Sequence, residues 1–353
     1  MSERWILRKG SKTNGFRYVD ARGRPMRDRA VRTRIDSLRI PPAWTDVHIA
    51  GSSRAAIQAW GFDAKGRKQY RYHLKAVEQG SLRKHYRVRQ LALDLPLIRE
   101  AVGRHFAASG HDPARALTRE RVTAGVVRLI SEGFFRVGSE RYAKENKTFG
   151  ITTLMKRHAR VDGDCVIFEY VGKKSIEQRQ VVVDPSLAEF VEELLETPGR
   201  RLFRYRTEDG QWADLTARDV NGYLHDLVGV PYTAKDFRTW GGTLRAATVL
   251  AEIGPPLSPT EAKRNVVTAV RLVAAELGNT PTICRKSYIH PMVLARYEDD
   301  GVTIAEGLVR ARRTRRKGEW LHAPEERALI EFLDKYFPER RKTRRGKDDE
   351  KAA

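Results

Sequence analysis

The chain has 353 residues, enough for two domains, and 41% of them are hydrophobic, so it can bury sizeable cores. No segment approaches the roughly 20 apolar residues of a membrane span, and the polar first residues do not resemble a secretion signal. Two cysteines do not make a disulfide framework, which favours a reducing, cytoplasmic location.

The charge is strongly positive and unevenly distributed. The net charge of the chain is +22, of which residues 1–90 carry +15, residues 91–310 carry +2 and residues 311–353 carry +5. A basic region with interleaved aromatic residues favours a nucleic acid as partner. We therefore expect a small basic domain over residues 1–90, a larger domain over 91–310 and a basic, partly disordered extension over 311–353.

The first 72 residues are typical of short strands in an antiparallel sheet. One hairpin is predicted with its turn at Asp63–Gly66, between "IQAWGF" and "RKQYRY". Residues 71–106 then have helical periodicity, and a break is expected near Pro96.

Most of the remaining chain is predicted to be helical. A helix is expected to start at residue 112, with Asp112 as N-cap and Pro113 in the first turn, and to reach the phenylalanine pair at 134–135. Residues 165–184 indicate two strands joined by a Gly-Lys-Lys-Ser turn. Further helices are predicted at 185–197, 216–229, 233–253, 258–278 and 324–337. The predicted fold class is α+β, a small antiparallel sheet domain followed by a larger, mainly helical domain.

Several kinds of chemistry have no motif in this sequence. Gly61 and Gly66 have the spacing of a phosphate-binding loop, but Arg67 stands where that loop needs lysine. No zinc motif and no G-x-S-x-G elbow are found. We therefore predict no nucleotide, metal or other cofactor. A DNA-acting protein without them can conserve bond energy through a covalent intermediate.

Four stretches, taken in order, resemble the poxvirus-like, bacterial branch of the type IB DNA topoisomerases. They are "FFRVGSERYAKENKTFGITTL" (134–154), "FEYVGKK" (168–174), "AKDFRTWGGT" (234–243) and "NTPTICRKSYIHP" (279–291). The similarity runs from about residue 30 to about residue 300 and includes "GRKQYRY" (66–72). This resemblance implies the catalytic fold shared by type IB topoisomerases and tyrosine recombinases.

The resemblance also implies the catalytic residues. Arg136 and Arg238 would bind the nonbridging phosphate oxygens, which suits the forked donors of guanidinium groups. Asn279 would donate a hydrogen bond to the same phosphate, and Lys173 would protonate the leaving 5′-oxygen. Tyr288 would be the nucleophile and form a 3′-phosphotyrosyl link. Strand rotation and resealing would then relax positive and negative supercoils without ATP or metal.

Contacts with double-stranded DNA follow from the same resemblance. The implied residues are Gln69, Tyr70, Tyr72, Tyr142, Thr153 and Lys235. The two domains of a monomer would form a clamp on the duplex, and phosphate contacts would dominate its affinity. The expected location is the nucleoid in the cytoplasm of a bacterium.

Each of these residues also has a structural interpretation. Arg136 could bind helix-end carbonyls, Lys173 could be an ordinary turn residue, and Arg238 could stack on neighbouring aromatic rings. Asn279 could be a helix cap, and Tyr288 a surface aromatic. The joint order of the five favours the catalytic interpretation.

Two neighbours of Tyr288 are predicted to be structural. We expect Cys284 to be buried one helical turn before Tyr288, and His290 to pack at a helix end.

Two other functions remain open. A tyrosine recombinase shares the Arg–Lys–Arg–Tyr chemistry, but it usually has His where this chain has Lys235, and a helical domain where residues 1–72 indicate strands. A nonenzymatic DNA-architectural protein would leave the five ordered residues unexplained.

Overall fold

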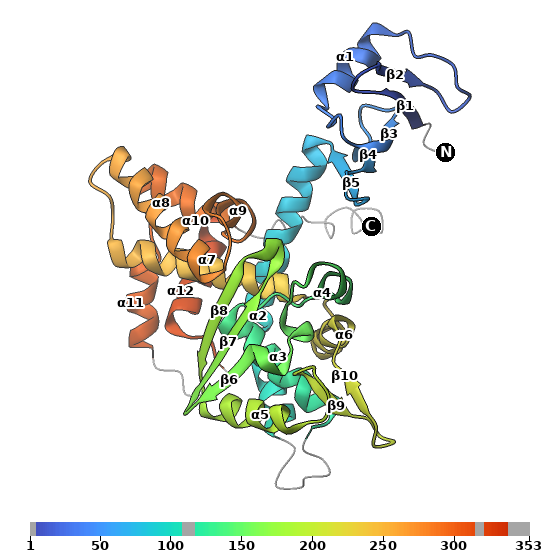
Figure 1. The fold of residues 1–353 in the computed structure, drawn as a ribbon. Helices are drawn as coiled ribbons and strands as arrows, with labels where there is room; N and C mark the ends of the chain where they lie inside the picture. The colour runs from blue at the N-terminus through green and yellow to red at the C-terminus, as the bar shows by residue number, and fades with distance from the viewer. Residues whose placement is uncertain (1–4, 108–116, 315–320, 338–353) are drawn as a thin grey trace, which may run out of the picture. The chain divides into compact units, whose positions relative to one another are not determined.

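The computed structural model describes residues 5–107, 117–314 and 321–337 (Figure 1). It divides into two compact units, Met1–His85 and Tyr86–Ala353, each with a hydrophobic core. The division falls inside helix α2 (Leu74–Ala107). The α+β prediction is confirmed: the first unit contains an antiparallel sheet, and the second is mainly helical.

The first unit is built on a five-stranded antiparallel sheet of order β2-β1-β3-β4-β5. Its strands are β1 (Trp5–Ser11), β2 (Gly15–Val19), β3 (Thr45–Ala50), β4 (Ile57–Phe62) and β5 (Lys68–Tyr72). The predicted hairpin turn joins β4 to β5. The carboxylate of Asp63 accepts the backbone N–H groups of Lys65 and Arg67 at 2.9 and 3.0 Å, and Gly66 supplies the positive φ of 68°.

The two faces of this sheet have different side chains. Ile6, Val47, Ile49 and Ala59 pack with Ile35 of helix α1 in the core. Side chains alternate along a strand, so the other face receives an aromatic row in which His48 pairs with Trp60 and Trp60 pairs with Tyr70.

Helix α1 (Arg29–Ser37) was predicted as extended chain, and that prediction is wrong. The Asp28 carboxylate accepts the backbone N–H groups of Ala30 and Val31, so it caps the helix. Only Ile35 of this nine-residue helix is buried. With only one buried apolar residue, this arginine-rich segment has no clear helical repeat of apolar positions, so its sequence did not predict a helix.

The second unit contains a three-stranded antiparallel sheet, β6 (Ala159–Asp162), β7 (Cys165–Val171) and β8 (Glu177–Val183), among its helices (Figure 1). The predicted turn between β7 and β8 is confirmed. Besides α2, the helices are α3 (Arg119–Gly133), α4 (Glu140–Asn146), α5 (Pro185–Glu196), α6 (Ala217–Val228), α7 (Ala234–Ile253), α8 (Pro259–Glu276), α9 (Pro281–Ser287), α10 (Pro291–Asp300), α11 (Ala305–Arg313) and α12 (Pro324–Tyr336). A short hairpin of β9 (Arg204–Arg206) and β10 (Trp212–Asp214) completes the unit.

Two helix boundaries differ from the predictions. Helix α2 continues through Pro96 without the expected break. Helix α3 begins after Thr118, whose hydroxyl accepts the N–H of Arg121 at 3.2 Å, and not at residue 112. Asp112 and Pro113 lie outside the described residues.

Helix α3 lies at the centre of the second unit. Its middle is fully buried, and a Cβ on Gly125 would come within 2.4 Å of the Phe190 ring of α5, so these helices need glycine for their close approach. This packing fixes the end of α3 and the loop that follows it, which carries Arg136.

Candidate active site

Helix α7 carries Arg238 into the interior. The helix starts at a capping box formed by Thr233 and Asp236. One turn later Arg238 is only 2% exposed. Its Nη1 donates to the carbonyl of Phe134, and its Nη2 donates to the carbonyl of Leu277 at 2.7 Å. Its Nε is buried and has no hydrogen-bond partner among the described residues.

Phe134 presents its carbonyl to Arg238 because it ends α3 in the left-handed conformation, with φ 52°. The chain then reverses and places Arg136 beside Arg238. Nη2 of Arg136 donates to the carbonyl of Gly278 at 3.0 Å and to Oδ1 of Asn279 at 2.8 Å. Its Nη1 donates to Oε1 of Gln178 at 3.3 Å.

Both arginines donate hydrogen bonds to residues 277–279. Leu277 and Gly278 end α8 and offer their carbonyls to Arg238 and Arg136, while Gly278 takes a φ of 58°. Asn279 uses its amide oxygen for Arg136, and its Nδ2 lies 3.3 Å from the Leu277 carbonyl.

Tyr288 follows α9 directly and is half-buried. Cζ of Arg238 lies 5.1 Å from the centre of its ring. The backbone of Tyr288 packs so closely on α7 that a Cβ on Gly242 would lie 2.8 Å from its carbonyl oxygen. Thr280 and Pro281 start α9, which ends at Ser287, and His290, next to Pro291, has extended backbone before α10.

The electrostatics of this cluster favour an anion. Neither Arg136 nor Arg238 forms an ion pair with a carboxylate among the residues that the structure describes. Burial, followed by the nearby charge of Arg136, lowers the pKa of Arg238 to about 10, so it remains charged at neutral pH. Both guanidiniums are held by neutral carbonyl groups, which do not balance their positive charge. A bound phosphate would supply the missing negative charge.

Lys173 is not joined to this cluster. It is exposed in the turn between β7 and β8, where its side chain makes no hydrogen bond or ion pair with the described part of the chain. The base of its hairpin does reach the cluster, because Gln178 at the start of β8 accepts from Arg136. Lys174 and Ser175 have positive φ values of 65° and 59°, so the turn is tightly curved.

The other expected DNA-contacting residues of this unit differ in exposure. Tyr142 on α4 is 47% exposed, and Lys235 in the first turn of α7 is also exposed. Thr153 is 1% exposed, and its hydroxyl both donates to the carbonyl and accepts from the N–H of Gly150, each at 3.0 Å. That position does not fit a direct contact with DNA. Thr153 instead fixes the chain beside the loop of Arg136.

In the first unit the expected DNA-contacting residues lie on β5. Tyr70 and Tyr72 are exposed, with ring centres 5.7 Å apart. Gln69 is half-buried, and its amide donates to the Asp63 carboxylate at 3.0 Å. The two tyrosines therefore form an exposed aromatic surface, while the Gln69 amide is hydrogen-bonded to Asp63 of the turn.

Three further residues contact the cluster or lie near Tyr288 in the sequence. Cys284 is fully buried one turn before Tyr288, as predicted, and burial raises the pKa of its thiol to about 11. His290 is 1% exposed and its Nδ1 accepts the N–H of Met292, which confirms its place at a helix end. Gln178 was missed: a buried glutamine on an otherwise exposed strand end has no local signal in the sequence.

Among the described residues, no group of three or more His, Cys, Asp or Glu side chains could hold a metal ion. In the same part of the chain, no helix is long and apolar enough to cross a membrane.

Known families match most of the chain. A model of the eukaryotic DNA topoisomerase I catalytic core matches residues 71–314, and a model of the bacterial DNA topoisomerase IB N-terminal domain matches residues 15–63. DNA topoisomerase 1B of Acanthamoeba polyphaga mimivirus is 30% identical over 274 residues, covering 76% of this chain and 80% of the relative. DNA topoisomerase 1B of Vaccinia virus (strain Copenhagen) is 24% identical over 254 residues, covering 68% and 72%.

Proposed function

The chain belongs to the type IB DNA topoisomerases, and we propose that Tyr288 is the nucleophile with which it opens one strand of its DNA substrate. The observation that carries this proposal is that Arg238 lies beside the Tyr288 ring, while residues 277–279 bind both Arg238 and Arg136. Together with Asn279, the two arginines and the tyrosine come from three separate stretches of the chain, 134–154, 234–243 and 279–291. A purely structural role would not require two uncompensated cations next to one tyrosine.

The proposed reaction is a pair of transesterifications. The Tyr288 oxygen forms a bond to phosphorus, the phenol proton passes to water, and the bond from phosphorus to the 5′-oxygen breaks. Lys173 gives the leaving 5′-oxygen a proton. The 3′-phosphotyrosyl link keeps the energy of the broken bond. The free 5′-end rotates about the intact strand, and its hydroxyl then attacks the link and restores the DNA.

Arg136 and Arg238 would stabilise the charge that develops on the nonbridging oxygens. The carbonyls of Phe134, Leu277 and Gly278 orient both guanidiniums before DNA binds, which reduces the reorganisation needed in the transition state. Asn279 would present its Nδ2 as a further donor. An amide does not titrate, so this residue acts by hydrogen bonding and not as an acid.

Binding of the duplex would use both units. In the first, Tyr70 and Tyr72 would meet the DNA; in the second, Tyr142 and Lys235 would contact its backbone. A monomer that clamps the duplex accounts for this division of contacts. The proposed location is the nucleoid in the cytoplasm.

The direct test is relaxation of a supercoiled plasmid by purified protein in EDTA without ATP. We expect both positive and negative supercoils to be removed, because the covalent link replaces an external energy source and no step uses a metal. Plasmid left supercoiled under these conditions would refute the proposal.

A further inference from the structure

The segment that follows α11 lies beyond the region matched by the family models, which ends at residue 314. Its described part, residues 321–337, consists of a short lead and helix α12. This segment contacts helix α7, which carries Arg238, and the chain just after Tyr288. The middle of α12 is buried in the core, and the contacts described below lie at the two ends of the segment.

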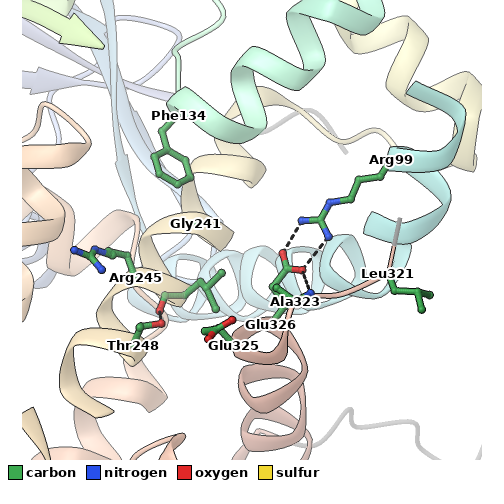
Figure 2. Close-up of a pocket in the computed structure, with 10 residues that line it drawn as sticks. Arg99, Phe134, Gly241, Arg245, Thr248, Leu321, Ala323, Glu325 and Glu326 are labelled. Carbon is green, nitrogen blue, oxygen red and sulfur yellow. Dashed lines mark hydrogen bonds and ion pairs between the residues drawn. The ribbon is translucent and has the colours of Figure 1, made fainter. Parts of the chain in front are cut away.

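At the first end, Glu326 is a buried carboxylate, 3% exposed. It receives two hydrogen bonds from Arg99 of α2, at 2.7 and 2.9 Å, and one from the N–H of Ala323 at 2.9 Å (Figure 2). Its Oε1 also lies 3.5 Å from the indole nitrogen of Trp240. Trp240 follows Arg238 by two residues on α7, so one carboxylate ties α2, α7 and α12 together.

The residues just before α12 also supply a hydrogen-bond donor that helix α2 lacks. Pro96 has no N–H, so the carbonyl of Ala92, four residues earlier, loses its helical partner. Nε2 of His322 lies 2.6 Å from that carbonyl oxygen and can donate to it. This contact explains why α2 passes through Pro96 without a break and why the C-terminal segment is anchored there.

At the second end, Phe337 packs against the segment that carries Tyr288. Its ring centre is 4.6 Å from that of His290, at an angle of 74°. His290 in turn donates its backbone N–H to the hydroxyl of Thr243 on α7, at 3.0 Å. The C-terminal segment thus contacts α7 near Arg238 and the chain two residues after Tyr288.

A cavity of about 490 Å³ lies beside the first of these contacts. Glu326, Arg99 and Gly241 line it together with Phe134, the residue whose carbonyl holds Arg238 (Figure 2). Gly241 of α7 packs directly on Phe134 in this region, because a Cβ on Gly241 would clash with the Phe134 ring. The Glu326 contacts with Arg99 and Trp240 hold α7 from the side of α12.

We propose that α12 is a positioning element for strand cleavage, in which Glu326 and Phe337 hold the arginine helix α7 and the Tyr288 segment in register. Neither residue touches the proposed reacting atoms; each acts through a neighbour, Trp240 or His290. This inference rests on the roles proposed above for Arg238 and Tyr288. It gives a function to a segment that the family match leaves out.

The test compares full-length variants on a DNA substrate that is cleaved once and cannot be resealed. Glu326→Gln and Phe337→Ala should each slow single-turnover cleavage by about 10-fold or more, because small misplacements of reacting groups are costly. DNA affinity should stay within about 2-fold of the original, as the contacts with DNA are elsewhere. Phe337→Tyr keeps the ring and should restore the cleavage rate.

Glu331→Gln is the matched control, since it removes the same charge from α12 but breaks only an exposed pair with Arg310 of α11. All rates are measured well below the melting temperature of each variant, and Phe337→Ala serves if Glu326→Gln does not fold. Normal cleavage by the Glu326 and Phe337 variants, or equal losses in Glu331→Gln, would overturn the inference. If Tyr288→Phe still formed a covalent adduct, the proposed nucleophile would fail instead.

Discussion

The guanidinium of Arg238 lies against the ring of Tyr288, with 5.1 Å between Cζ and the ring centre. The same guanidinium is held by two backbone carbonyls from separate segments, those of Phe134 and Leu277. A phosphate bound at this arginine would therefore be next to the tyrosine. The contact between Arg238 and Tyr288 therefore places a buried positive charge where the proposed strand cleavage needs one.

Arg238→Lys should reduce single-turnover cleavage by on the order of 10²-fold, as for removal of a preorganised transition-state donor. A lysine has one nitrogen and cannot satisfy both carbonyls while also meeting a phosphate oxygen. The measurement is the cleavage rate at saturating enzyme. Arg245→Lys is the control, because Arg245 lies on the same helix in an exposed pair with Glu276. A wild-type rate in Arg238→Lys would remove Arg238 from the proposed site.

Gly242→Ala should impair both stability and cleavage. The added Cβ would lie 2.8 Å from the Tyr288 carbonyl oxygen and 3.1 Å from Cδ1 of Leu277, so α7 and the tyrosine segment must separate. Overpacking of this kind costs about 1–3 kcal/mol. Gly222→Ala in helix α6 meets nothing within 4 Å and should leave cleavage unchanged while stabilising the protein slightly. Denaturant unfolding and the cleavage rate, measured on both variants, check this contrast.

Lys235→Ala should weaken DNA binding at every sequence tested and lower the slope of log affinity against log salt by about 1. The reason is that an exposed lysine at the start of α7 would neutralise one phosphate. Titrations at several salt concentrations measure this slope. An unchanged slope would show that Lys235 points away from the bound duplex.

Glu326→Gln should destabilise the protein at neutral pH by about 3 kcal/mol, because Arg99 loses its partner. Burial acts to raise the pKa of Glu326, but the hydrogen bonds and charge of Arg99 outweigh it, and the pKa is lowered. A carboxyl with a lowered folded pKa stabilises the fold above its unfolded pKa of about 4.3, and that contribution is lost as the pH falls through the folded value. The difference between variant and original should therefore shrink below about pH 4 in unfolding measurements. A difference independent of pH would contradict the ion pair.

The sequence predicted those parts of the molecule whose signals are local. Thr216 marks the start of α6, and Asp63 with Gly66 marks a hairpin, because caps and turns depend on neighbouring residues. Pro96 misled the prediction, since its effect on α2 is offset by His322, more than 200 residues away. Long-range compensation of this kind leaves no pattern near the proline.

The candidate site shows the same difference between what the sequence marks and what only the fold brings together. Arg136, Arg238 and Tyr288 could be selected through their order in the chain. The burial of Thr153 could not be predicted, because its hydroxyl forms hydrogen bonds with the backbone of Gly150 only in the folded loop. Gln178 was missed because its importance comes from contacts with Arg136 and Gly278, which lie far from it in the sequence. Such contacts are a property of the packed structure and not of any short segment.

In the proposed mechanism Tyr288 carries the covalent link to DNA. The link can be located by trapping the protein on a DNA substrate that loses its 5′-end after cleavage, digesting the adduct and finding the attached nucleotide by mass spectrometry. We expect a 3′-phosphate on Tyr288, no adduct in Tyr288→Phe, and a normal adduct in Tyr205→Phe, which alters a half-buried tyrosine on β9. A nucleotide on any other residue, or an adduct that persists in Tyr288→Phe, would contradict this mechanism.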